Sequence, residues 1–220
     1  MENGQSARGR WLEVGPDRIG GWLESFAARH GGAVTQVRPD VVTVRAADGA
    51  VAACHPPFPP LPDGIAGTGA ELAAHASADR TVGVLLVRLG GYAAGVFAGT
   101  EPRLVASKVG SRLVHGRSAA GGQSQQRFAR RREKQAGEAL AAAADCAAAV
   151  FAGYAGDLDA VVLGGDKRAI AALRADPRLR PYFGLAADRF LTVPDPRLKV
   201  LQATPSAFRA IRIRLAEPAA

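Results

Sequence analysis

Three short apolar runs between residues 80 and 114 constrain the fold more than any other feature of this 220-residue sequence. They are RTVGVLLVRLG (80–90), YAAGVFAGTE (92–101) and RLVASKVGSRLV (103–114), with turn signals at Gly90-Gly91 and Thr100-Glu101. A parallel crossover needs a dozen or more residues, so connections this short predict three antiparallel strands in a meander.

Helices and further strands alternate after the meander. The pattern predicts a helix from about Ser124 to Ala152, a buried strand over 159–166 and a helix over 167–183 that breaks at Asp176-Pro177. A strand over 188–194 and a helix over 195–204 follow, and the alternating segment 208–216 is compatible with either a strand or a helix. The order β-β-β-α-β-α-β predicts an α/β domain with a mixed sheet. One face of the long helix is expected to contain Phe128, Ala136, Leu140, Ala147 and Phe151.

The N-terminal part of the chain has a different pattern. A helix is expected to begin near Pro16-Asp17, and the alternating segment that follows contains a hairpin turn at Asp48-Gly49. The Pro-rich stretch 55–69 continues neither element. We therefore expect a small α+β domain over 1–56, a Pro- and Gly-rich linker over 57–69 and the α/β domain over 70–220.

Composition excludes several classes of protein. Hydrophobic residues make up 48% and charged residues 22% of the chain, which is typical of a globular protein. Neither a bilayer-spanning apolar run nor the apolar core of a signal peptide is present, so we expect a cytoplasmic protein without a membrane partner. Cys54 and Cys146 lack metal-type spacing and are expected to be buried, reduced thiols.

Positive charge is concentrated in one segment. Residues 103–135 contain nine basic residues and one acid, so they carry +8, which equals the formal net charge of the whole chain. A localised basic feature is typical of nucleic-acid binding because each Lys or Arg on a phosphate releases counterions. Acidic lipids or an acidic protein would attract the same charge, so charge alone leaves these partners open.

The segment GGQSQQRFARRREK at 121–134 resembles the GGQ segment of eukaryotic and archaeal class-I peptide release factors. Gly121, Gly122, Gln123 and Ser124 stand on the GGQS motif, and residues 127–130 stand on the RFAR sequence that follows it. The order of elements also resembles the middle, catalytic domain of those factors. The resemblance covers roughly residues 70–216 and implies an RNase H-like mixed sheet with a GGQ loop and a long helix.

The chain departs from those factors because no codon-reading motif precedes the catalytic domain. It resembles instead the Vms-like family of release-factor-like peptidyl-tRNA hydrolases, as an actinobacterial member. This resemblance implies codon-independent release of nascent chains from stalled ribosomes, that is, ribosome rescue and quality control. The implied partners are the large subunit at its peptidyl-transferase centre, peptidyl-tRNA and rRNA. We expect a monomer that needs neither a cofactor nor a metal.

The resemblance also implies the site residues. Gln123, directly after Gly121 and Gly122, is the preferred catalytic glutamine, but relatives often carry a GxxQ variant, so Gln125 remains the alternative. The expected RNA-binding residues are Arg112, Arg117, Arg127, Arg130, Arg131, Arg132 and Lys134.

Two other classes of function remain as alternatives. One is a non-catalytic ribosome- or RNA-binding protein that reuses the fold with an inert loop. The other is a nuclease with an RNase H-like site, which would need several carboxylates to hold divalent metals. The strands predicted over 80–114 contain almost none. His115 and the Gly164-Gly165-Asp166 turn carry only weak signals of a role, and His55 is interpreted as a loop histidine.

Overall fold

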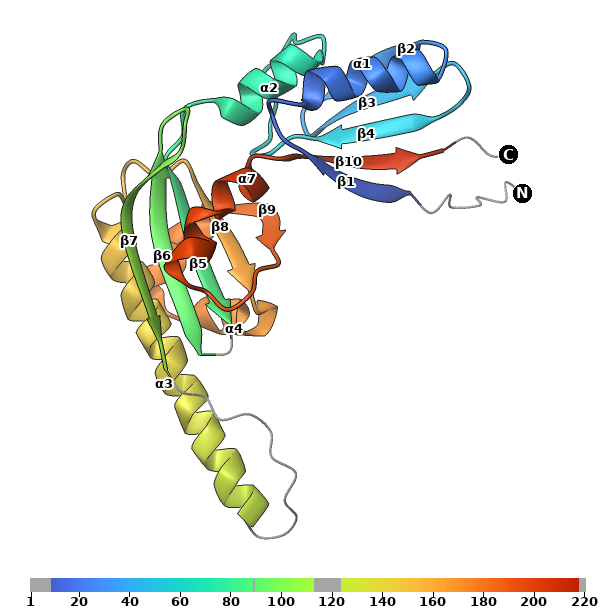
Figure 1. Ribbon diagram of the computed structural model, residues 1–220. Helices are drawn as coiled ribbons and strands as arrows, with labels where there is room; N and C mark the ends of the chain where they lie inside the picture. The colour runs from blue at the N-terminus through green and yellow to red at the C-terminus, as the bar shows by residue number, and fades with distance from the viewer. Residues whose placement is uncertain (1–8, 89, 113–123, 218–220) are drawn as a thin grey trace. The chain divides into compact units, whose positions relative to one another are not determined.

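The computed structural model of the protein describes residues 9–88, 90–112 and 124–217 (Figure 1). For residues 124–129, 131 and 132 it describes the backbone alone. Contacts divide the chain into two units, of which unit 1 comprises residues 1–78 and 206–220 and unit 2 comprises residues 79–205. Among the described residues, no helix is both long enough and apolar enough to cross a membrane.

Unit 2 is built on a five-stranded mixed sheet with the order β7-β6-β5-β8-β9. The strands are β5 (Val82–Arg88), β6 (Gly91–Ala98), β7 (Arg103–Ser111), β8 (Ala160–Gly165) and β9 (Ala186–Leu191). The first three pair antiparallel, which confirms the predicted meander, and β8 and β9 add in parallel beside β5. This strand order confirms the mixed α/β sheet and is the RNase H-like arrangement that the resemblance implied.

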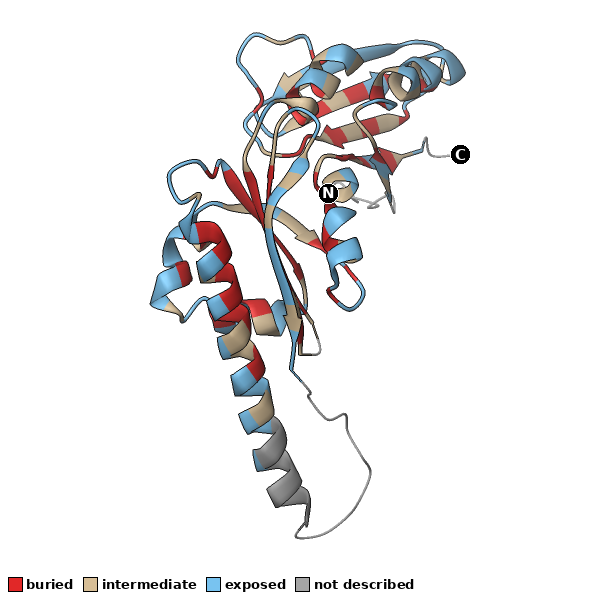
Figure 2. Ribbon diagram, turned by 60° about the vertical axis from the view of Figure 1, so that its left-hand side comes forward, coloured by how far each residue is buried: buried red, intermediate tan, exposed pale blue. Residues whose placement is uncertain are grey.

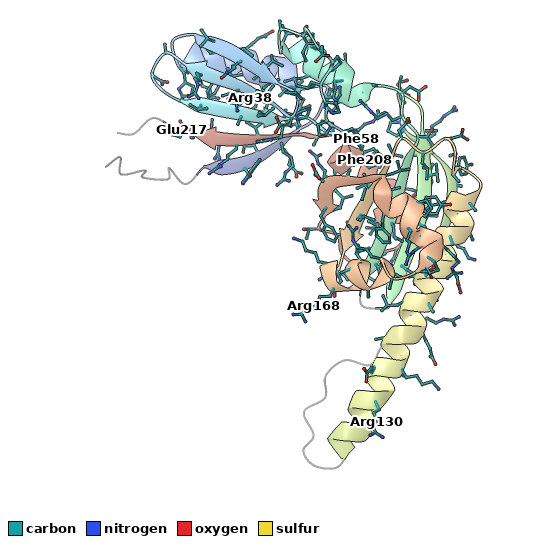
Figure 3. The ribbon with its side chains drawn as sticks, turned by 180° about the vertical axis from the view of Figure 1, so that it is seen from behind. Arg38, Phe58, Arg130, Arg168, Phe208 and Glu217 are labelled. Atoms are coloured by element: carbon teal, nitrogen blue, oxygen red, sulfur yellow. The ribbon has the colours of Figure 1, made fainter. Side chains whose placement is uncertain are left out.

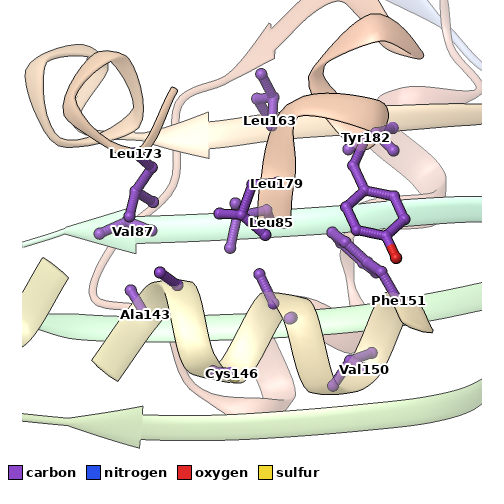
Figure 4. Packing of buried hydrophobic residues seen from close by; sticks show 14 of the residues in the cluster. Leu85, Val87, Ala143, Cys146, Val150, Phe151, Leu163, Leu173, Leu179 and Tyr182 are labelled. Atoms are coloured by element: carbon purple, nitrogen blue, oxygen red, sulfur yellow. The ribbon is translucent and has the colours of Figure 1, made fainter. Parts of the chain in front are cut away.

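Helices cover both faces of this sheet. On one face, α3 (Ser124–Ala152) packs against the meander together with α4 (Lys167–Leu173), the 3-10 turn η1 (Pro177–Leu179) and α5 (Arg180–Gly184). Helix α6 (Leu198–Gln202) lies on the other face. Its position is indicated at Gly95 of β6, where an added Cβ would meet the Leu201 side chain. Coverage on both faces explains why β5 is buried along nearly its whole length. Figure 4 shows the core beneath α3.

The predicted break in the helix over 167–183 is confirmed. The Asp176 carboxylate accepts a hydrogen bond from the backbone N–H of Arg178 and so caps the 3-10 turn that follows. The Arg178 guanidinium also binds this carboxylate at 2.7 Å, and this side-chain hydrogen bond is the main reason why the pKa of Asp176 is lowered. Proline at the next position cannot continue the preceding helix, so the chain turns here.

Unit 1 contains an antiparallel five-stranded sheet with the order β1-β10-β4-β3-β2. Its strands are β1 (Arg10–Val14), β2 (Ala33–Arg38), β3 (Val41–Ala46), β4 (Val51–His55) and β10 (Ile211–Ala216). Two helices, α1 (Ile19–Arg29) and α2 (Gly69–Ser77), lie on the same side of the sheet (Figure 1). Phe26 of α1 and Leu72 of α2 are buried against strand residues such as Val42 and Ile213. The unit is therefore α+β, with one covered and one open sheet face.

The structure divides the chain at different residues from those expected. Residues 208–216 end in a strand, β10, which pairs with β1 and β4 and so joins the C-terminal end of the chain to unit 1. The stretch 57–69 leads into α2 within the same unit. At the end of α7 (Thr204–Phe208), the Phe208 ring lies 6.0 Å from the Phe58 ring, centroid to centroid.

The sequence pattern missed two elements, α2 and β1. A capping box formed by Thr68 and Glu71 marks the start of α2, and this Thr-x-x-Glu spacing is visible in the sequence.

Candidate functional site

Helix α3 carries most of the candidate site. Its first residue, Ser124, directly follows Gly121, Gly122 and Gln123 in the sequence. These three residues, together with Arg117 and His115, lie outside the described residues. Gln125 is described as part of the first turn of the helix. Of the two candidate glutamines, the structure therefore describes Gln125 alone, and it places this residue inside α3.

The C-terminal half of α3 is fixed in the core of unit 2. Ala143 and Ala147 are fully buried, and the Phe151 ring lies edge-on to Tyr182 with centroids 5.1 Å apart. The Cys146 thiol donates a hydrogen bond to the carbonyl oxygen of Lys108 on β7 at 3.3 Å. An ion pair of 2.8 Å joins Asp145 to Arg178 of η1. Figures 2 and 4 show this half of the helix against the sheet.

The N-terminal half of α3, residues 124–138, has different surroundings. None of its described side chains, those of 130 and 133–138, is buried. The ribbon continues past the ends of the neighbouring strands in Figures 1 and 3, and Figure 3 labels Arg130 on this part. At a rise of about 1.5 Å per residue, this half spans roughly 20 Å. Ala136 was expected on one face of the helix with Leu140, Ala147 and Phe151; it is exposed, and burial along α3 begins at Ala139.

Helical periodicity arranges the basic residues of α3. Arg127, Arg130, Arg131 and Lys134 are spaced by three or four residues, so the backbone places them on one side of the helix. Lys134 and the buried Ala143 are nine residues apart, which is about half a turn out of phase. The basic side of the exposed half therefore continues the side of α3 that faces away from the sheet. Arg132 falls outside this stripe.

Two described basic residues show how lightly this charge is neutralised. Arg130 is exposed, and Lys134 lies 3.9 Å from Glu138, with both side chains well exposed. Such an exposed i,i+4 pair contributes only about 0.3–0.5 kcal/mol, so Lys134 can exchange it for another anion. Arg112 directly follows β7 and is exposed, while its backbone N–H donates to the Gly90 carbonyl at 2.9 Å. The described members of the predicted RNA-binding set are thus accessible.

Other candidate groups serve the local structure. Asp166, after the Gly164-Gly165 pair, accepts hydrogen bonds from the N–H groups of Arg168 and Ala169, so it caps α4. His55 was expected in a loop, but it is the last residue of strand β4. Within the described part of the chain, no group of three or more His, Cys, Asp or Glu residues is arranged to hold a metal ion.

These features define an α/β domain whose mixed sheet anchors a long helix, with the exposed basic half of that helix directly after a Gly-Gly-Gln sequence. The sequence profile of the family described as "Actinobacteria/chloroflexi VLRF1 release factor" matches residues 80–214, more than half of the chain. The protein belongs to this release-factor family. Membership implies a function related to translation termination or rescue, and with it an interaction with the ribosome.

Solved structures give a more distant likeness. The crystal structure of the archaeal translation termination factor aRF1 matches with a TM-score of 0.43 and 12% identity, over 92% of this chain and 67% of that one. A second structure, of an archaeal protein, matches with a TM-score of 0.36 and 14% identity, over 92% of this chain and 66% of that one. The chain thus spans about two thirds of the length of each. No curated protein matches the sequence.

Proposed function

We propose that the protein is a codon-independent peptidyl-tRNA hydrolase that releases nascent chains from stalled ribosomes. The proposal rests on where one short motif lies in the sequence. The Gly121-Gly122-Gln123 sequence lies inside the family match and directly before α3, whose exposed half is basic. The proposed partners are the large subunit at its peptidyl-transferase centre, peptidyl-tRNA and rRNA. The same reasoning assigns the protein to ribosome rescue and quality control.

The proposed reaction is hydrolysis of the ester between the peptide and the terminal ribose of the tRNA. It needs a water positioned for attack and stabilisation of the oxyanion that develops on the carbonyl. A glutamine side chain has no useful pKa and cannot be a general base. Its amide can orient the water, and its backbone N–H can donate to the oxyanion. Glycines before it remove the side chains that would prevent close approach to RNA.

Gln123 remains our preferred catalytic residue. Gln125 belongs to α3, where the helix fixes its φ and ψ, whereas Gln123 directly follows two glycines in the sequence. Glycines allow backbone conformations that other residues rarely adopt, so they help a following glutamine to place both its amide and its N–H toward one reacting carbon. This difference supports the GGQ register over the GxxQ register.

The basic residues have a separate proposed role. Arg112, Arg117, Arg127, Arg130, Arg131, Arg132 and Lys134 are assigned to the phosphates of rRNA and tRNA. Phosphate contacts fix orientation without reading sequence, which suits a factor that acts whatever the codon. An arginine also offers several donors in a planar fork, so it holds phosphate more firmly than a point charge does.

The test is peptide release from peptidyl-tRNA on purified large subunits, with single substitutions compared at equal ribosome occupancy. We expect Gln123→Ala to slow release about a hundredfold or more, the typical cost of losing one oriented transition-state contact. The backbone N–H survives in alanine, so residual activity is expected. Gly122→Val should be at least as damaging, because it both restricts the backbone and thickens the segment.

Gln125→Ala is the matched control for this test. A larger loss at Gln125 than at Gln123 would transfer the catalytic role to the GxxQ register. If neither substitution slows release while both variants still bind the subunit, the hydrolase proposal fails. The non-catalytic ribosome-binding alternative would then replace it.

A further inference from the structure

The sheet of unit 1 has an open face on the side away from α1 and α2. Side chains alternate between the two faces of a strand, and the covered face includes Val14, Val42, Cys54 and Ile213, which pack with both helices. The strand pairing then assigns the intervening residues to the open face. These are Trp11 and Glu13 on β1, Arg212, Arg214 and Ala216 on β10, Val51, Ala53 and His55 on β4, Val41, Thr43 and Arg45 on β3, and Val34, Gln36 and Arg38 on β2.

The charge of the open face is unbalanced. Its strand residues, all described by the structure, include four arginines and one acid, Glu13. Glu13 lies 3.8 Å from Arg212, and it is half-exposed there. Arg38, Arg45 and Arg214 are exposed and come from three different strands. The positive charge is therefore spread across the sheet, as a polyanion lying over the strands would require.

A tryptophan lies exposed on the same face. Trp11 is 49% exposed, although most large aromatic side chains of this size gain from burial. The Arg212 guanidinium stacks on its ring at 4.8 Å, and the His55 ring lies 5.5 Å away. The other tryptophan, Trp22 of α1, is partly buried and stacks on Phe26 in the core at 5.5 Å. Packing in the core of unit 1 therefore explains why a tryptophan stands at position 22, but it does not explain the tryptophan at position 11.

We propose that this open sheet face, centred on Trp11, Arg45 and Arg214, binds single-stranded RNA. An unpaired base would stack on the Trp11 ring, and the phosphates that flank it would contact the arginines of neighbouring strands. Sheet faces that bind RNA combine such exposed aromatics with basic side chains, because a base offers its π face whatever its identity. Thr43 and Gln36 add hydrogen-bonding groups between the arginines.

An acidic protein segment is the competing occupant. The carboxylates of such a segment would pair with the arginines, but they would not stack on an exposed indole that is already flanked by a guanidinium. The stacked Trp11–Arg212 pair is the feature that favours RNA. The inference does not rest on the proposed hydrolase function, since it concerns a different unit of the chain and can be tested without ribosomes.

The experiment is a fluorescence titration of the full chain with a short oligouridine. The chain has two tryptophans, so a Trp22→Phe background leaves Trp11 as the only indole. We expect saturable quenching of Trp11 emission, since a stacked base lies directly against the ring. Replacing Arg45→Ala and Arg214→Ala together should weaken this binding about tenfold and lower the salt slope by roughly 1.4, the value for two lost phosphate contacts on a single strand.

The matched control is the pair Arg18→Ala and Arg29→Ala, which removes the same charge from exposed positions at α1, on the covered side of the sheet. This pair should leave quenching nearly unchanged. Circular dichroism and thermal melting would confirm that both double variants fold. The inference is overturned if oligouridine does not quench Trp11, if the two double variants weaken binding equally, or if poly-glutamate quenches as strongly as RNA.

Discussion

The two halves of α3 form one continuous helix, yet they differ in almost every physical respect. From Ala139 onward the helix is apolar except for Asp145, packs against β5, β6 and β7, and is held by the Cys146–Lys108 hydrogen bond. Before Ala139 it is charged, and none of its described side chains is buried. The comparison shows that stability and the proposed ribosome binding depend on different parts of one element. Substitutions in the two halves should therefore have separable consequences.

The largest effect is expected in the anchored half. Phe151→Ala removes a fully buried ring that contacts Tyr182, and such a truncation typically costs about 3–5 kcal/mol through lost transfer energy and the cavity left behind. We expect a large drop in the melting temperature of unit 2. Ribosome affinity measured well below that temperature should change little, because Phe151 lies far along the helix from the arginines.

Thiol labelling would locate that instability. Burial raises the pKa of the Cys146 thiol, and it raises the pKa of Cys54 in unit 1 to about 12. Both cysteines are buried and free, so each should react slowly at neutral pH, where almost no thiolate is present. Phe151→Ala should speed alkylation of Cys146 but not of Cys54. Equal acceleration at both thiols would show that the two units unfold together and would contradict a local effect.

Much of the fold was predictable from the sequence because local pattern and tertiary burial agree there. The meander, α3, β8 and the break at Asp176 follow from apolar runs and turn residues whose meaning does not depend on distant parts of the chain. Strand β10 was not predictable in the same way, because its alternation suits either a strand or a helix until pairing with β1 and β4 decides it. The start of α3 near Ser124 was predicted, but the lack of packing before Ala139 was not, since periodicity places Ala136 on one face with Leu140 and Phe151 without showing where packing ends.

Prediction of functional sites from the sequence is limited in the same way, by long-range pairing. The GGQ sequence and the basic run can be found by inspection, whereas the open face of unit 1 cannot. Trp11 and Arg212 are about two hundred residues apart in sequence, and only the register of β1 with β10 brings the ring and the guanidinium to 4.8 Å. Long-range strand pairing of this kind leaves no local signal in the sequence.

The second largest effect is expected on ribosome affinity, from substitutions in the exposed half of α3. Reversing three charges, with Arg130→Glu, Arg131→Glu and Arg132→Glu, should lower ribosome affinity by on the order of a hundredfold and reduce the salt slope by about 2 or more. Intact protein making six or more phosphate contacts should lose about a thousandfold in affinity between roughly 50 and 200 mM salt. Sedimentation of protein with ribosomes across a salt series measures both.

The control for charge reversal is an equal change elsewhere in unit 2. Lys167→Glu, Arg168→Glu and Arg180→Glu alter three exposed basic residues of α4 and α5. If this control weakens binding as much as the α3 variant, the effect arises from net charge and the assignment of the α3 arginines to phosphates is wrong. Melting temperatures of both variants should remain close to that of the unmodified protein, because surface substitutions rarely change stability by more than about 0.5 kcal/mol.

The smallest expected effect lies at the junction of the two halves. Gly137 is an exposed glycine inside α3, two residues before burial begins, and a Cβ there would meet no neighbouring atom within 4 Å. Glycine in a helix interior costs roughly 0.5–1 kcal/mol relative to alanine. Gly137→Ala should therefore stabilise the helix by about that amount without changing any contact.

The substitution should stabilise mainly the helical residues that precede Gly137. The anchored half supplies the helical nucleus, and helicity must propagate through Gly137 to reach residues 130–136, so hydrogen exchange of those backbone amides should slow in Gly137→Ala. Gly156→Ala, an equally unobstructed site after the end of α3, is the matched control and should leave their exchange unchanged. If exchange at 130–136 does not slow, the basic half does not depend on the anchored half for its helicity. If exchange slows and peptide release falls with it, bending at Gly137 is part of how the Gly-Gly-Gln segment reaches its substrate.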